Sequence, residues 1–258
     1  MAWTKFPYSD DAYVYTAASV KKAWARLHVG DAEPFPKNAA VVEAWIAFHA
    51  GEFEKAAKLG LDAGMDGYAV AHKATCIYAT YLESNEKKKI ALYEEVAERC
   101  ERQQAEQPDN AAGFYWHAYA LGRYAQGISI VKALAQGIAP KVRASLDRTI
   151  ALAPKHSDAQ IALGAFHSEI IDSVGAMIGG LTYGVKKDEG YKAFKKALEL
   201  NPDTAIGRIE YANALVTLDG KKKMDEAVAL YEAAAAVDPK DAMERLDVEA
   251  AKEELDDE

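Results

Sequence analysis

Apolar residues recur at helical spacing along the chain, and no segment sustains an alternation of apolar and polar positions. The stretches at 10–27 (DDAYVYTAASVKKAWARL), 67–83 and 86–107 all follow this spacing. Apolar residues three and four positions apart are typical of an amphipathic helix, whereas alternation would indicate a strand. The pattern therefore predicts an all-α fold, with a first helix over residues 10–27.

A short phrase ending in proline divides the second half of the chain. It reads SLDRTIALAP before residue 155, AFKKALELNP before residue 203 and LYEAAAAVDP before residue 240, and QPDN at 107–110 carries an earlier proline. A helix that ends just before proline, with a new helix starting just after it, is typical of the junction between helical hairpins. The spacing therefore predicts a chain of successive hairpins.

The phrase resembles the tetratricopeptide repeat (TPR), a helical hairpin of about 34 residues. The matching positions are Leu163, Gly164, Phe194, Ala197 and Pro202 in one repeat, and Tyr211, Ala212, Leu215, Ala227, Tyr231, Ala234 and Pro239 in the next. Small residues at such positions let paired helices approach closely, and larger residues fill the space between neighbouring repeats. The resemblance implies an α-solenoid of about five helical hairpins with a C-terminal capping helix and a concave face.

Two repeats are longer than the motif, and their extra residues fall at 127–140 and 170–187. The paired inserts and the phrase GGLTYGVKKDEGYKAFKKALELNP resemble those of the T-component proteins of bacterial TRAP transporters. The stretch AAGFYWHAYALGRYAQ resembles the helix that opens the preceding repeat in that family and in the related regulator-of-microtubule-dynamics group. This resemblance covers about residues 110 to 240. Within the second insert, Gly179 and Gly180 are expected to break a helix.

These signals predict one superhelical domain over residues 1–258. Its parts are an N-terminal helix and loop (1–36), degenerate hairpins (37–110), TPR repeats of which two carry inserts (111–240), and an acidic capping helix and tail (241–258).

Aromatic residues concentrate in the helix that opens at residue 111, where GFYWHAYALGRYAQ occupies 113–126. Counting along the repeat places several of these side chains on the concave face, and the same counting selects residues of other repeats. The predicted groove residues are Trp45, Phe48, Tyr115, Trp116, Tyr119, Arg123 and Asn213. Such a surface suits a peptide with hydrophobic anchors or a small apolar ligand. The alternative is that the inserts fold back over these residues and make them part of the core.

No catalytic or metal-binding arrangement stands out in the sequence. The six histidines are scattered, and none forms an HExxH motif or a pair one helical turn apart. His167-Ser168-Glu169 matches the H-x-E of zinc deaminases, but no PCxxC motif follows it. We therefore expect a protein that is not an enzyme and that uses no cofactor and no metal.

The charge distribution argues against a nucleic-acid partner. The net charge is −9, and residues 241–258 hold nine acidic against two basic residues, which accounts for −7 of it. No apolar run reaches the ~18 residues of a membrane span. The first residues lack the basic and apolar regions of a secretory signal, and only two cysteines are present. These features favour a reduced, cytoplasmic protein, and a homo-oligomer is compatible with all of them.

Two functions are consistent with these observations. The first is a scaffold or adaptor that binds a protein or peptide in the aromatic-lined groove. The second is a small hydrophobic-ligand-binding protein, related to the T-component proteins, in which the two inserts serve as lids.

Overall fold

The computed structural model describes residues 3–256, and these residues form helices and connecting segments without a β-strand. Three 3-10 turns, η1 (Asp11–Tyr13), η2 (Gly64–Gly67) and η3 (Gly220–Lys223), precede α1, α4 and α13. The α-helices are α1 (Ala17–Leu27), α2 (Ala39–His49), α3 (Phe53–Asp62), α4 (Tyr68–Tyr81), α5 (Glu86–Glu106), α6 (Ala111–Ile128), α7 (Ile130–Ala135), α8 (Ile138–Leu152), α9 (Ser157–Val174), α10 (Ala176–Tyr183), α11 (Lys187–Leu200), α12 (Ala205–Asp219), α13 (Met224–Ala235) and α14 (Ala242–Asp256). The predicted all-α fold is confirmed. Within the described range, no helix combines the length and hydropathy needed to cross a bilayer.

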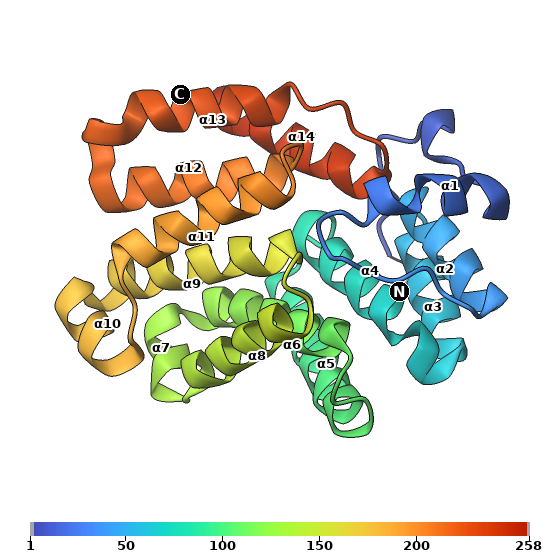
Figure 1. Cartoon of the computed structure of the whole chain (residues 1–258), viewed down its shortest axis with the longest axis horizontal. Helices are drawn as coiled ribbons and strands as arrows, with labels where there is room; N and C mark the ends of the chain where they lie inside the picture. Colours follow the sequence, from blue (N-terminus) through green and yellow to red (C-terminus); the bar gives the residue numbers. More distant parts are fainter. Residues whose placement is uncertain (1–2, 257–258) are drawn as a thin grey trace.

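The helices pack as consecutive hairpins. The pairs are α2 with α3, α4 with α5, α6 with α8, α9 with α11, and α12 with α13. The first helices of these pairs contact one another in succession, from α2 through α4, α6 and α9 to α12, and so form an inner row. Figure 1 shows the pairs following an arc from the blue N-terminal helices through the green α6 and α8 to the orange and red α12 and α13. The predicted solenoid of about five hairpins is confirmed.

Side-chain caps set where several helices begin. Asn110 and Thr204 follow the proline turns, and their side-chain oxygens accept hydrogen bonds from backbone N–H groups at 3.1 Å in the first turns of α6 and α12. A cap of this kind stabilises a helix start by about 1 kcal/mol. At the N-terminus, Thr16 and Ser19 cap each other's backbone, so α1 begins at residue 17. The predicted helix over 10–27 is therefore wrong in its first turns, where η1 and an extended segment replace it.

Close packing between α9 and α11 explains the glycine of the repeat. A Cβ atom on Gly164 would lie 2.7 Å from ring carbons of Phe194, which is itself fully buried. The small residues Ala197, Ala212 and Ala227, which match the repeat, are also fully buried. Only residues without a bulky side chain let the two helices pack this closely. The small residues of the repeat pattern therefore mark the positions where neighbouring helices are in close contact.

The two inserts form the short helices α7 and α10. Gly179 and Gly180 do not break α10, which continues through both of them. A Cβ on Gly179 would lie 2.8 Å from the Val185 side chain, so glycine here serves the return of the chain against α10. The expectation of a helix break at these residues is thus wrong. Glycine is needed at position 179 because the segment after α10 packs closely against the helix, and not because the helix ends there.

The C-terminal helix α14 does more than cap the last hairpin. It packs on α12 and α13 and also contacts α2, near the other end of the solenoid. In Figure 1 the red α14 lies between the C-terminal hairpin and the blue α1. The start of α14 supplies Ala242 and Leu246 to the hydrophobic core of the N-terminal helices, whereas Val248 and Ala251 belong to the C-terminal core. The concave side of the solenoid is therefore bridged by α14.

Candidate functional site

A cavity of about 140 Å³ lies on the inner side of the solenoid. Its walls come from the inner helices α4, α6, α9 and α12, from α7 and α8, and from α14, which supplies Met243 and Asp247. A cavity of roughly 150 Å³ is large enough to hold a benzene ring. The space is thus suited to a small molecule, and the elements that line it come from both halves of the chain.

One half of the cavity is apolar. Helix α7 contributes Ile130, Ala133 and Leu134, and α8 contributes Ile138 and Val142. Ala133 is 2% exposed, so α7 packs tightly onto the helices below it. The segment turns sharply at both ends of α7, where Ser129 has φ 89° and Gly137 has φ 70°. The insert at 127–140 therefore folds back over the inner face and covers it.

The opposite half carries aromatic rings from α6. The Tyr115 and Trp116 rings lie 4.8 Å apart at 74°, and the Trp116 and Tyr119 rings lie 5.3 Å apart at 61°, which are edge-to-face arrangements. The Tyr119 hydroxyl is 2.9 Å from the hydroxyl of Thr80 on α4. The Arg123 guanidinium lies 5.4 Å from the centre of the Tyr119 ring. The residues of one helix thus form a continuous aromatic wall.

Arg123 also forms an ion pair. Its Nη2 donates to Glu210 Oε1 of α12 at 3.0 Å, and Glu169 of α9 accepts from Gln126 Nε2 at 2.5 Å. Burial lowers the pKa of Arg123, but the neighbouring Tyr119 and Glu210 raise it further, so the guanidinium stays charged. Burial and then the Glu210 charge raise the pKa of Glu169 to about 7.

Helix α14 brings a carboxyl group to the cavity. Asp247 lines the space, is 4% exposed and accepts a hydrogen bond from the Tyr81 hydroxyl of α4. Burial raises the pKa of Asp247 well above its usual range, and the charges of Glu244, Asp241 and Asp158 add to the effect. Asp158 at the start of α9 is the next acid in this wall, and burial raises its pKa to about 6.

Lys73 of α4 is a buried cation at the edge of the cavity. Its Nζ donates to Asp31 Oδ2 at 2.6 Å, and Asp31 Oδ1 lies 2.9 Å from His28 Nδ1. Burial lowers the pKa of Lys73, but the Asp31 charge outweighs it and the net shift is upward. Burial lowers the pKa of His28 to about 4, so its imidazole is neutral at pH 7. Lys73 is thus already neutralised by a neighbour outside the cavity.

The predicted groove residues lie in three places. Tyr115, Trp116, Tyr119 and Arg123 line the cavity together. Trp45 and Phe48 are at most 1% exposed and do not line it, because they lie behind Lys73, whose Nζ is 5.7 and 5.2 Å from their ring centres. Asn213 faces α13 instead, where it accepts a hydrogen bond from Tyr231. The residues predicted from the repeat to line one groove therefore do not form a single surface, and only the four residues of α6 line the cavity.

Some residues of the site could not be found from the repeat pattern. Asp247 belongs to the acidic C-terminal stretch, whose composition is typical of a solvated cap. Tyr81 lies in a degenerate hairpin without a motif to orient it. The apolar residues of α7 belong to an insert, and only the alternative that the inserts fold back anticipates their place. No metal cluster of three or more His, Cys, Asp or Glu side chains occurs within residues 3–256.

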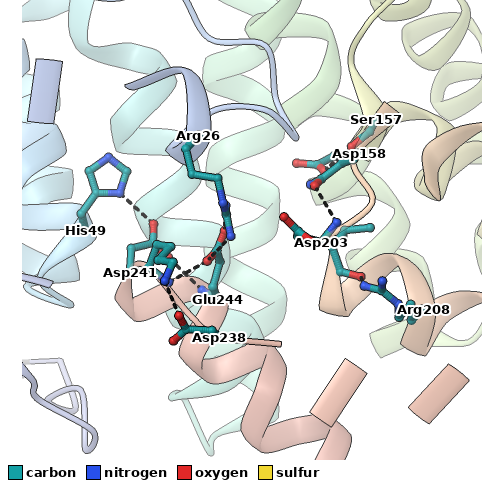
Figure 2. A network of polar contacts seen from close by, with 12 residues as sticks. Arg26, His49, Ser157, Asp158, Asp203, Arg208, Asp238, Asp241 and Glu244 are labelled. Atoms are coloured by element: carbon teal, nitrogen blue, oxygen red, sulfur yellow. Dashed lines mark hydrogen bonds and ion pairs between the residues drawn. The ribbon is translucent and has the colours of Figure 1, made fainter. Parts of the chain in front are cut away.

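A polar network fastens α14 to the N-terminal helices beside the cavity. Figure 2 shows Asp241, the residue before α14, directed at His49, and Glu244 of α14 directed at Arg26. His49 Nδ1 lies 2.7 Å from Asp241 Oδ2, and Arg26 holds Glu244 with two contacts of 2.5 and 3.2 Å. The Tyr15 hydroxyl donates to the carbonyl of Lys240 at 2.8 Å. These contacts keep the cavity wall formed by Met243 and Asp247 in place.

Comparison with known proteins identifies the fold. The crystal structure of TTC0263, a thermophilic TPR protein of Thermus thermophilus, matches 83% of this chain and 97% of its own chain with a TM-score of 0.58 and 18% identity. This chain has a TPR fold. No protein-family model matches it, and no curated protein sequence matches it either. The resemblance to the T-component proteins of TRAP transporters therefore stays a prediction.

Proposed function

We propose that this protein binds a small molecule in the cavity between α6, α7, α9 and α14, and that it is not an enzyme. The observation that carries the proposal is the position of α7. Ala133 and Leu134 of this helix line the same cavity as Tyr115 and Trp116, and both of these rings are buried. An apolar, concave cavity with a few convergent polar groups is the usual form of a small-molecule site.

A peptide in the concave groove has less support. Tyr115 and Trp116 are 5% and 4% exposed, and Asp247 of α14 is bonded to Tyr81 on the inner row. A peptide could reach the aromatic wall only by displacing α14 or α7. The small-ligand function that the inserts suggested is therefore preferred over the groove-binding scaffold.

A cavity-filling substitution tests the proposal. Ala165 of α9 lines the cavity, whereas Ala151 of α8 is exposed and does not. We expect the wild-type protein to bind small apolar probes such as phenethyl alcohol, measured by calorimetry and by native mass spectrometry. Ala165→Leu should abolish this binding, and Ala151→Leu should leave it unchanged. Equal binding by all three proteins, or none by the wild type, would contradict the proposal.

A protein-interaction scaffold is the second candidate, and the exposed face of α10 favours it. Met177, Ile178 and Leu181 share this face and are 77%, 54% and 85% exposed. Large apolar side chains gathered on one face are typical of a protein contact surface. If a polypeptide partner docks here, Leu181→Ser should abolish its capture, and Lys192→Ser on the exposed side of α11 should not. Unchanged capture by both variants would exclude α10 as the contact.

A further inference from the structure

Acidic side chains outnumber basic side chains in the lining of the cavity. The acids are Asp158, Glu169, Glu210 and Asp247, and the bases are Lys73 and Arg123. Both bases already have anionic partners, Asp31 at 2.6 Å and Glu210 at 3.0 Å. No cation of the cavity is therefore left for an anionic ligand.

Three of the acids are not neutralised by a direct ion pair. Asp158, Glu169 and Asp247 form no ion pair with any residue from 3 to 256. Asp247 accepts only the Tyr81 hydroxyl, and Asp158 has only a long contact of 3.4 Å with the Ser157 hydroxyl. Burying a carboxylate without a cation is unfavourable. Asp158 and Asp247 line the same cavity, and the charge of Asp158 adds to the upward shift in the pKa of Asp247.

A cavity-lining tyrosine carries a hydroxyl group without a hydrogen-bond partner among the described residues. Tyr115 lines the cavity and is 5% exposed, and its hydroxyl makes no hydrogen bond with the described residues. Asp158 lines the same cavity, and the Tyr115 ring lies 4.4 Å from the ring of His156, two residues before Asp158 in the chain. Buried polar groups in folded proteins are nearly always hydrogen-bonded, so an unpaired hydroxyl facing a cavity indicates a place for a ligand.

We propose that the cavity binds a small organic amine in its cationic form, with the ammonium group between Asp158, Asp247 and the tyrosines and the hydrocarbon part against α7 and α8. This assignment rests on the proposed function, since it names the ligand class of the same cavity. Carboxylates supply the counter-charge, and the faces of Tyr81 and Tyr115 attract a desolvated ammonium. The Tyr115 hydroxyl accepts one of its N–H groups.

The remaining chemistry of the cavity excludes two other cations. A metal ion needs several oxygen or nitrogen ligands around one point, and the described residues offer no group of three. A long polyamine would extend beyond a space of about 140 Å³. An arylalkyl or short alkyl amine matches both the size and the apolar half.

Three probes of nearly equal size separate charge from shape. Phenethylamine is cationic at pH 7, phenethyl alcohol is neutral and phenylacetate is anionic. Calorimetric titration of the full chain is expected to give a dissociation constant for phenethylamine at least about 10-fold below that for phenethyl alcohol, and no binding of phenylacetate. Asp158→Asn and Asp247→Asn should each weaken phenethylamine about 10-fold and leave phenethyl alcohol unchanged.

Asp225→Asn is the matched control, because Asp225 of α13 is exposed and the substitution removes the same charge. It should change none of the three affinities, and thermal melting verifies that each variant is folded. Binding of phenethyl alcohol or phenylacetate as tight as that of phenethylamine would overturn the amine assignment but support a small-molecule cavity. Binding of none of the three probes to the wild type would contradict the proposed function itself.

Discussion

His49 of α2 and Asp241 at the start of α14 lie 192 positions apart in the sequence, yet His49 Nδ1 is 2.7 Å from Asp241 Oδ2. Both side chains are buried, at 0% and 2% exposure. Burial raises the pKa of Asp241, but the hydrogen bond and charge of His49 outweigh it, and the net shift is downward. This pair joins segments near the two ends of the solenoid, so that α14 spans its concave side.

Removing this pair should destabilise the whole protein. Asp241→Ala leaves the buried His49 without its partner, and the loss of one member of a buried pair costs about 3–5 kcal/mol. The free energy of unfolding in urea measures this effect. Asp238→Ala, three residues earlier, removes a carboxylate that is 82% exposed and is expected to cost at most about 1 kcal/mol. Equal effects of the two substitutions would show that α14 is not fastened through His49.

A pair of glycines should respond to alanine in opposite ways. Gly164→Ala places a methyl group 2.7 Å from the buried Phe194 ring and should cost about 1–3 kcal/mol. Gly122→Ala in α6 meets no atom within 4 Å and should stabilise the helix by about 1 kcal/mol. Thermal melting distinguishes the two, and a stable Gly164→Ala variant would mean that α9 and α11 are less closely packed than described.

Trp116 should contribute mainly to stability. It is 4% exposed and contacts the Tyr115 and Tyr119 rings, so Trp116→Ala is expected to cost about 3–5 kcal/mol in urea unfolding. Trp116→Phe keeps a ring at this position and should cost much less. A cost below about 1 kcal/mol for the alanine variant would instead place this ring on an accessible surface.

The stability of the protein should fall on the alkaline side of neutrality. Burial raises the pKa of Glu169 to about 7 and that of Glu33 to about 8, against roughly 4.3 in an unfolded chain. Below these values both carboxyls stay protonated in the folded protein, whereas the unfolded chain has released the protons. The stability that they contribute is therefore lost as pH rises, and the loss is complete only above pH 7 for Glu169 and above pH 8 for Glu33. We expect the free energy of unfolding to decrease by about 2–3 kcal/mol between pH 6.5 and 8.5.

Histidines oppose this trend below pH 6.5. Burial lowers the pKa of His28 and His156 to about 4 and that of His72 to about 3. These side chains stay neutral in the folded state while the unfolded chain takes up protons below about 6.5. Burial also raises the pKa of Asp158 to about 6, so three carboxyls oppose the three histidines. The two effects offset each other between about pH 4.5 and 6.5, where the unfolding free energy should be nearly constant. Glu169→Gln should reduce the alkaline decline, and a stability that rises steadily up to pH 8.5 would contradict the assignment.

The sequence predicted the hairpins well because their determinants are local. Gly164, Ala197 and Ala212 occupy positions where one helix approaches the next, and the proline turns with Asn110 and Thr204 begin new helices. Each of these signals acts over a few residues or between adjacent helices. The four groove residues of α6 were predicted as one group for the same reason, since a single helix carries them all.

The path of α7 and α14 could not be read from the repeat. Both elements depart from the repeat pattern, so nothing in their spacing states which surface they cover. Asp247 meets Tyr81, and Asp241 meets His49, only because the solenoid curves enough to bring its two ends together. That curvature is the sum of small rotations between neighbouring hairpins.

The sequence by itself thus determined the helices, their pairing and the aromatic composition of the inner face, since these depend on residue spacing and side-chain size. The tertiary structure decided that this face lines a cavity and that three of its acids form no ion pair with the described residues. Trp45 and Phe48 became core and Tyr115 and Trp116 became cavity wall because of what packs over them. Whether a side chain is buried and whether its charge is paired depend on contacts between segments that are distant in the sequence. A local sequence pattern does not predict such contacts.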